Sequence, residues 1–97
     1  MNQMTATSVL SPSVQDAISD QQDRIVQWLR QYIADVLSLP PNSIDVEASF
    51  QQIGLDSSAA VGMTGDLGDW LGRDLDPAIA YDHTSISALS RALVEGA

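Results

Sequence analysis

The sequence predicts an all-α protein: a small four-helix bundle of three main helices and one short helix, with a long first loop. Apolar residues recur at three- and four-residue spacing in three separate segments. No segment shows the alternation of apolar and polar residues that is typical of a strand. Prolines and glycines stand between these segments, where they begin or end helices. The 97 residues suffice for one domain with a modest core.

The first part of the chain differs in composition from the rest. It is rich in Ser, Thr, Gln and Asn, contains Pro12 and shows no sustained period. We therefore expect a flexible N-terminal arm at 1–18, followed by the folded domain at 19–97.

The first main helix is predicted to begin at Ser19 or Asp20, because either side chain can cap a helix. It should end before Pro40-Pro41, since neither proline offers an amide hydrogen. Arg24 and Arg30 are expected on its outer face. Its predicted inward face consists of Ile25, Trp28, Leu29, Tyr32, Ile33, Val36 and Leu37.

A long connection at 40–56 follows, and we expect its three apolar residues, Ile44, Val46 and Phe50, to fold back onto the core. One helical turn at 50–53 is predicted before Gly54.

The second main helix is predicted from Ser57 to about Leu71, with Gly72 as a C-terminal cap. It contains three glycines, and each costs up to about 1 kcal/mol relative to alanine inside a helix, so packing must hold it. The predicted inward face is Ala60, Val61, Met63, Thr64, Leu67, Trp70 and Leu71.

The last third of the chain predicts a brief helix at 77–81, because proline suits a first helical turn, and then a third main helix capped by Ser85. The apolar residues of this last helix are Ile86, Leu89, Leu93 and Val94, and Gly96 ends it.

Composition excludes several functions. The chain has thirteen acidic residues but only four arginines and no lysine, so the formal net charge is -9. Such a chain repels nucleic acid and anionic membranes and favours partners with basic patches, although the charge could also serve solubility alone. There is no cysteine and only one histidine, which argues against a thiol nucleophile or a metal site. Without an apolar run of 18 residues or a secretory signal, we expect a cytoplasmic protein.

Ser57 is the residue on which the functional interpretation depends. It stands at a predicted helix start, where free amide hydrogens and a partial positive charge favour a phosphate group. A serine hydroxyl needs a base to act as a nucleophile, and none is near in the sequence, so a small hydrolase is disfavoured. Attachment of a phosphoester by another enzyme explains this serine better, and the alternative is a plain helix cap.

A wider pattern decides between these alternatives. Phe50-x-x-x-Gly54-Leu55-Asp56-Ser57, Trp70-Leu71-Gly72 and Tyr81-Asp82-x-x-Ser85-Ile86-x-x-Leu89 together resemble an acyl carrier protein domain. The resemblance covers about residues 22–95 and is strongest to the carrier domains of polyketide synthases.

This resemblance implies that Ser57 carries 4′-phosphopantetheine from coenzyme A, beside Asp56, and that the chain is a non-catalytic carrier. Acyl groups would be held as thioesters and shuttled in polyketide or related fatty-acyl biosynthesis. The implied partners are a phosphopantetheinyl transferase and a ketosynthase, acyltransferase or acyl-activating ligase with a basic docking surface. The carrier is expected to be a monomer. The implied partner-facing residues are Ser58, Ala59, Gly62, Met63, Asp66 and Asp69.

Two alternatives stay open, a peptidyl or aminoacyl carrier and an unmodified helical interaction domain. Ser58 also stands where the family usually has an apolar residue, so it could compete with Ser57 for modification.

Trp28 and Trp70 are expected to pack in the core, and His83 to be a loop residue. Asp74 and Asp76 are too few for a calcium site, so no metal is expected.

Overall fold

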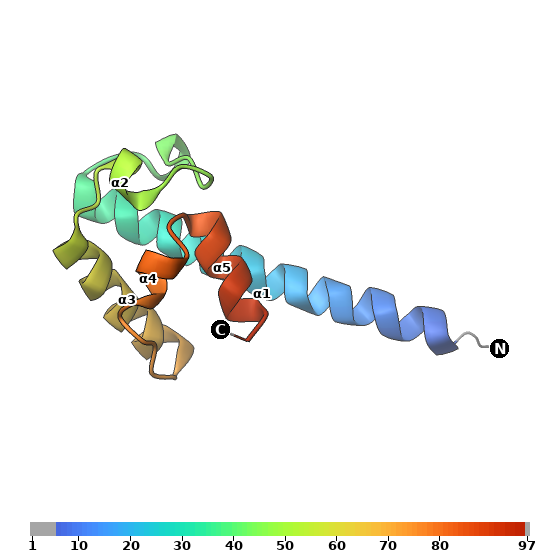
Figure 1. Cartoon of the computed structure of the whole chain (residues 1–97). Helices are drawn as coiled ribbons and strands as arrows, with labels where there is room; N and C mark the ends of the chain where they lie inside the picture. Colours follow the sequence, from blue (N-terminus) through green and yellow to red (C-terminus); the bar gives the residue numbers. More distant parts are fainter. Residues whose placement is uncertain (1–5, 97) are drawn as a thin grey trace.

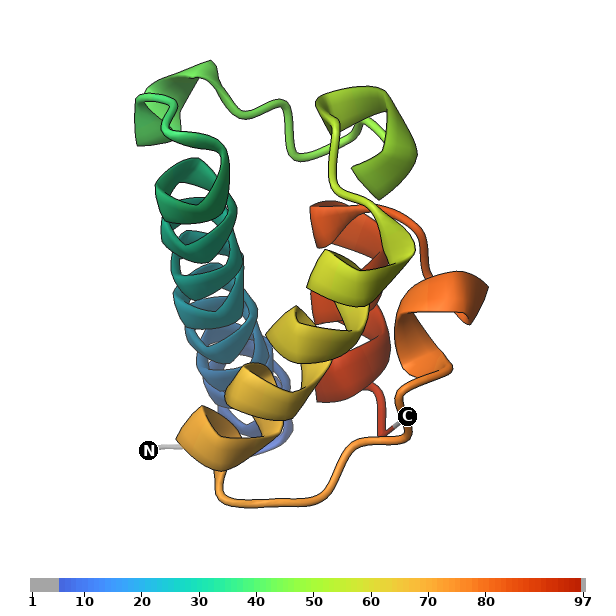
Figure 2. The same ribbon diagram turned by 90° about the vertical axis from the view of Figure 1, so that its left-hand side faces the viewer.

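The computed structural model describes residues 6–96, with side chains from Ser19 onward. Its elements are α1 (Ala6–Leu37), η1 (Pro41–Ser43), α2 (Phe50–Ile53), α3 (Ser57–Leu71), α4 (Ile79–Asp82) and α5 (Ile86–Val94). The long helices α1, α3 and α5 surround the core, and α4 lies beside α3 and α5 (Figures 1 and 2). The predicted all-α class, with three main helices and short helices between them, is confirmed.

The first helix is much longer than the sequence predicted. It spans 32 residues from Ala6, and its N-terminal half projects beyond the rest of the fold (Figure 1). The predicted start at Ser19 or Asp20 is therefore wrong. Extending an existing helix adds one hydrogen bond per residue without a new cost of nucleation, so the helix continues towards the N-terminus. Residues 1–5 of the expected arm lie outside the described residues, and the mobility expected of 1–18 stays a prediction.

The core combines one face from each long helix. In α1, Ala34 is buried, whereas Val36 is 48% exposed, so the prediction that Val36 faces inward is wrong. Arg30 is half-buried, with an enclosed Nε, and does not lie on the outer face as expected. The largest side chains that are completely enclosed are Ile25, Leu29, Ile33, Met63, Leu67, Ile86 and Leu89.

The long first connection is packed and hydrogen-bonded, as its apolar residues predicted. Ile44 and Phe50 are buried, and Val46 packs against the core at its edge. The amide of Phe50 donates to the carbonyl of Thr84 at 2.7 Å, and the amide of Ser87 donates to the carbonyl of Val46 at 3.0 Å. This connection is thereby tied to the start of α5.

The turn after α3 requires a glycine inside the helix. The amide of Arg73 donates to the carbonyl of Gly68 at 3.0 Å, and Gly72 has φ of 75°, the left-handed conformation that ends the helix. A Cβ atom at Gly68 would lie 2.7 Å from the carbonyl oxygen of Arg73. Gly68 therefore allows the chain to fold back closely, whereas Gly65 faces open space.

The short helix begins two residues later than predicted, at Ile79. Pro77 and Ala78 form a turn instead, in which the Ala78 amide donates to Asp76 Oδ1 at 2.9 Å. The predicted cap of α5 is confirmed, since Ser85 Oγ accepts the Ala88 amide at 3.1 Å. Within residues 6–96, no helix is both long enough and apolar enough to cross a membrane.

Candidate functional site

The chain reaches the start of α3 through a tightly specified turn. Ser49 and Gln52 cap α2 reciprocally, and the turn closes with the Leu55 amide donating to the Phe50 carbonyl at 2.9 Å. Gly54 has φ of 108°, which strongly favours glycine. Phe50 and Leu55 are both buried and anchor the turn to the core. The spacing of Phe50, Gly54 and Leu55 thus fixes where the next helix begins.

Asp56, and not Ser57, caps α3. The backbone of Asp56 is extended, and its Oδ1 accepts the amide of Ala59 at 2.9 Å. Ser57 is the first helical residue and its side chain is exposed. The interpretation of Ser57 as a plain helix cap is therefore wrong. Its hydroxyl makes no hydrogen bond within the described part of the chain, and the amides of Ser57 and Ser58 belong to the first turn, where helices lack internal acceptors.

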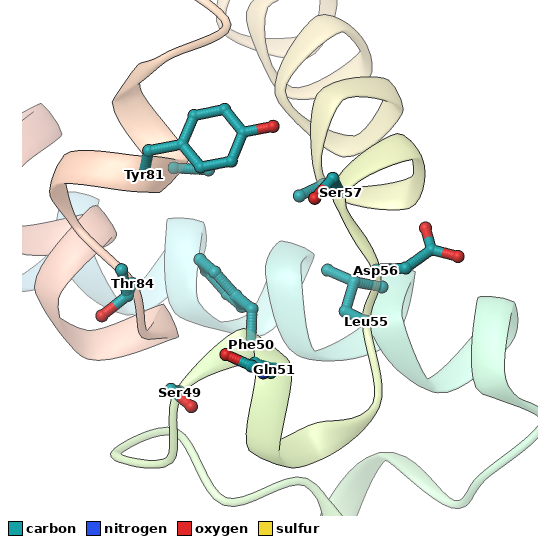
Figure 3. A pocket seen from close by; sticks show the side chains of 10 residues that line it. Ser49, Phe50, Gln51, Leu55, Asp56, Ser57, Tyr81 and Thr84 are labelled. Atoms are coloured by element: carbon teal, nitrogen blue, oxygen red, sulfur yellow. The ribbon is translucent and has the colours of Figure 1, made fainter.

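Ser57 borders a hollow of about 560 Å³ between α2, the start of α3, and α4. Figure 3 shows the hydroxyl of Tyr81 directed towards the start of α3, with Phe50 below it. Tyr81 is 56% exposed, although it lines the hollow. The wall mixes polar and apolar residues: Ser49, Phe50, Gln51, Leu55, Asp56, Ser57, Ala60, Ala80, Tyr81 and Thr84.

Among the described residues, no side chain that could act as a base is hydrogen-bonded to the Ser57 hydroxyl, and Asp56 Oδ1 accepts the Ala59 amide instead. The only histidine of the chain, His83, lies apart from this hollow, in a second depression with Asp74, Asp76 and Asp82. Within residues 6–96, no three such side chains, those of this depression included, are arranged so that they could hold a metal ion. A serine hydroxyl is a weak nucleophile unless a base activates it, and an exposed hydroxyl at a helix N-terminus is accessible to an enzyme that modifies it.

The predicted partner-facing residues of α3 do not all reach the surface. Ser58, Gly62, Asp66 and Asp69 are exposed, and Ala59 is half-buried. Met63 is completely enclosed, so its assignment to the partner-facing surface is wrong. Conversely, Val61 is 42% exposed, although the sequence predicted that it faces inward.

The two tryptophans lie on one outer surface. Trp28 is half-buried, and Trp70 is 42% exposed, so the prediction that Trp70 packs in the core is wrong. Nearby, the hydroxyl of Tyr32 donates to Asp66 Oδ2 at 2.8 Å. Partial burial, this hydrogen bond and the negative charge of Asp66 raise the pKa of Tyr32 above 10.0.

Sequence comparison identifies the class of protein that this arrangement defines. Residues 27–93 match the family model described as a phosphopantetheine attachment site. The chain therefore belongs to the phosphopantetheine-binding carrier proteins, which are non-catalytic carriers.

Three individual proteins illustrate the relationship. Over 88 residues the chain is 39% identical to the acyl carrier protein TtuC of Teredinibacter turnerae, covering 91% of this chain and 94% of TtuC. It is 31% identical over 83 residues to the polyketide synthase PksM of Bacillus subtilis, covering 86% of this chain but only 2% of PksM. A free-standing peptidyl carrier protein from Acinetobacter baumannii superposes with a TM-score of 0.72 at 31% identity, over 77% of this chain and 94% of the other.

Proposed function

We propose that this protein is an acyl carrier that holds intermediates of polyketide or related fatty-acyl biosynthesis as thioesters on 4′-phosphopantetheine attached to Ser57. One observation carries the proposal: Asp56 takes the capping position, and the Ser57 hydroxyl, at the first position of α3, is exposed and has no hydrogen bond to any described residue. The similarity to TtuC and to a polyketide synthase supports the acyl and polyketide assignment.

The residues around Ser57 suit a phosphodiester. The amides of Ser57 and Ser58 stand in the first turn of a 15-residue helix, whose N-terminus stabilises negative charge. The carboxylate of Asp56 is turned towards the Ala59 amide, so its charge is partly balanced there. The hollow beside Ser57, with Tyr81 and Thr84 on its far wall, offers polar and apolar contacts to the proximal part of the arm.

Attachment would be performed by a phosphopantetheinyl transferase. The Ser57 oxygen forms the new P–O bond, the bond to the departing 3′,5′-ADP of coenzyme A breaks, and the transferase removes the hydroxyl proton. When bound, the arm supplies the thiol that this cysteine-free chain lacks.

Intact mass spectrometry tests this assignment. The chain is incubated with coenzyme A and a broad-specificity phosphopantetheinyl transferase, and Ser57→Ala is compared with its neighbour Ser58→Ala. We expect one phosphopantetheine increment on wild type and Ser58→Ala and none on Ser57→Ala. An increment retained in Ser57→Ala would place the arm on Ser58, and no increment on wild type, when a control carrier is modified, would contradict the function.

A peptidyl or aminoacyl carrier is the second candidate, because a peptidyl carrier superposes with a TM-score of 0.72. Loading the chain with acyl- or aminoacyl-phosphopantetheine and offering it to a ketosynthase or a condensation domain distinguishes the two. Acyl transfer to a ketosynthase supports the acyl carrier, whereas consumption only by a condensation domain supports the peptidyl carrier.

A further inference from the structure

A stack of aromatic rings joins the outer surfaces of α1 and α3. Trp28 stacks on Tyr32, with ring centroids 5.1 Å apart and planes at 21°, and on Trp70, at 5.6 Å and 17°. The guanidinium of Arg24 lies 6.0 Å from the centroid of Trp70. An open hollow of about 410 Å³ runs along this stack. We call the following residues the aromatic face: Asp23, Arg24, Gln27, Trp28, Tyr32 and Trp70.

The exposed ring of this stack, Trp70, is not required to fill the core. Leu29 of α1 and Met63 and Leu67 of α3 belong to the core cluster and are all 0% exposed, so the core between these helices is already closed to water. Trp70 nevertheless keeps 42% of its surface in water. A large aromatic ring beside an open hollow is typical of the anchor positions of protein interfaces, where its burial contributes much of the binding energy.

The chemistry of the aromatic face selects a cationic occupant. Arg24 demonstrates that the ring of Trp70 accepts a guanidinium, which aromatic rings attract through their quadrupole. Asp23 lines the same hollow, and Asp69 is exposed one residue before Trp70. The net charge of -9 draws basic partners to the whole molecule. An arginine flanked by an apolar side chain matches both the charge and the hollow.

The aromatic face is continuous with the proposed partner-facing surface of α3. The hydrogen bond from Tyr32 to Asp66 joins the stack to the exposed acidic residues of that helix. Trp70 follows Ser57 by 13 positions in α3, which corresponds to about 20 Å along the helix. A partner that receives the arm at Ser57 can therefore contact Trp70 at the same time, without Trp70 touching the attachment site.

We propose that the aromatic face is a docking surface for a partner helix that presents an arginine beside an apolar side chain, with Trp70 as the anchor. The partner arginine takes the place of Arg24 over Trp70, and Asp23 balances its charge. This inference rests on the proposed carrier function and adds to it a second contact that is separate from Ser57.

The probe is a helical peptide with arginine and leucine four residues apart, compared with a peptide in which neutral citrulline replaces each arginine. Binding to the full chain is followed by tryptophan fluorescence and by the indole N–H resonances. We expect both indole resonances to shift and the citrulline peptide to bind at least about fivefold more weakly. Trp70→Ala should weaken binding at least about tenfold, as for an interface anchor. Arg24→Gln should strengthen peptide binding, because it removes the guanidinium that lies over the Trp70 ring.

Val61→Ala is the matched control, because Val61 is on the same helix and is also 42% exposed; its affinity should equal that of wild type. Unshifted indole resonances, equal affinity of the two peptides, or equal losses in Trp70→Ala and Val61→Ala would overturn the proposal. A dimer in sedimentation experiments that Trp70→Ala dissociates would assign the face to a second copy and also overturn it. The same variants are tested for phosphopantetheine attachment: if wild type is not modified, it is the carrier function that fails.

Discussion

At the N-terminal end of α3 Ser57 is positioned by backbone geometry, whereas at the C-terminal end Trp70 is positioned by ring stacking. The N-terminal end uses the left-handed Gly54, the cap from Asp56 and the buried Phe50. The C-terminal end uses the stack on Trp28 and the close turn at Gly68. The comparison shows that one helix presents Ser57, the proposed attachment site, at one end and the exposed ring of Trp70 at the other, with about 20 Å between them.

Truncating the two aromatic anchors should show the largest difference. Phe50 is 5% exposed, so Phe50→Ala should lower the free energy of unfolding by about 3–5 kcal/mol. Trp70→Ala should cost less, about 1–3 kcal/mol, since Trp70 is already 42% exposed and loses its stack and only part of a buried surface. Urea unfolding measures both values. Comparable losses would show that the two ends are equally important to the core.

Two glycines of α3 sharpen the comparison further. Gly68→Ala should lose about 1–3 kcal/mol, because the new Cβ would meet the Arg73 carbonyl, a backbone atom. Gly65→Ala is the matched control and should gain about 0.5–1 kcal/mol, since its Cβ meets nothing and alanine favours the helix. Thermal unfolding of both variants checks this; a stabilised Gly68→Ala would contradict the close approach.

The cap at the N-terminal end has a smaller expected effect. Asp56→Ala should lower the free energy of unfolding by about 1 kcal/mol, because it leaves the Ala59 amide without its acceptor. Asp56→Asn keeps an acceptor, so its free energy of unfolding should stay within a few tenths of a kcal/mol of the wild-type value. Chemical unfolding of the pair measures this. If the asparagine variant is as unstable as the alanine variant, the charge and not the cap stabilises this end.

The smallest effect concerns Tyr32 and Asp66 at the other end. The pKa of Tyr32 lies above its ordinary 10.0, so the fold favours the protonated phenol. This contribution to stability is present below pH 10 and is lost as the pH rises through the raised pKa. In a Tyr81→Phe background, where Tyr32 is the only tyrosine, Asp66→Asn should lower the midpoint of phenolate absorbance. An unchanged midpoint would show that Asp66 has no influence.

The sequence predicted the N-terminal end well because that end depends on local geometry. Phe50, Gly54 and the start of α3 are fixed by turn chemistry within eight residues of Ser57. The sequence did not show which of the neighbours Asp56 and Ser57 caps the helix, since both aspartate and serine are good caps.

The outward faces of the helices were harder to predict. About 100° of rotation per residue places Val61 and Trp70 near opposite edges of the face centred on Ala60. Both residues could therefore be predicted to face inward. The glycines of α3 are neither apolar nor charged, so they do not mark where the buried face of the helix ends. Met63 lies nearer the centre of that face and is buried. The start of α1 was missed because composition alone does not show that an existing helix will extend.

Locating the modified atom tests the central claim most directly. After reaction with coenzyme A and the transferase, cleavage at Arg30 and Arg73 releases one fragment that contains both candidate serines. Fragmentation between Ser57 and Ser58 then assigns the phosphopantetheine increment. The structure of the cap predicts an increment on Ser57 alone, in wild type and in Trp70→Ala alike. An increment on Ser58, or its loss in Trp70→Ala, would contradict the separation of the two ends of α3.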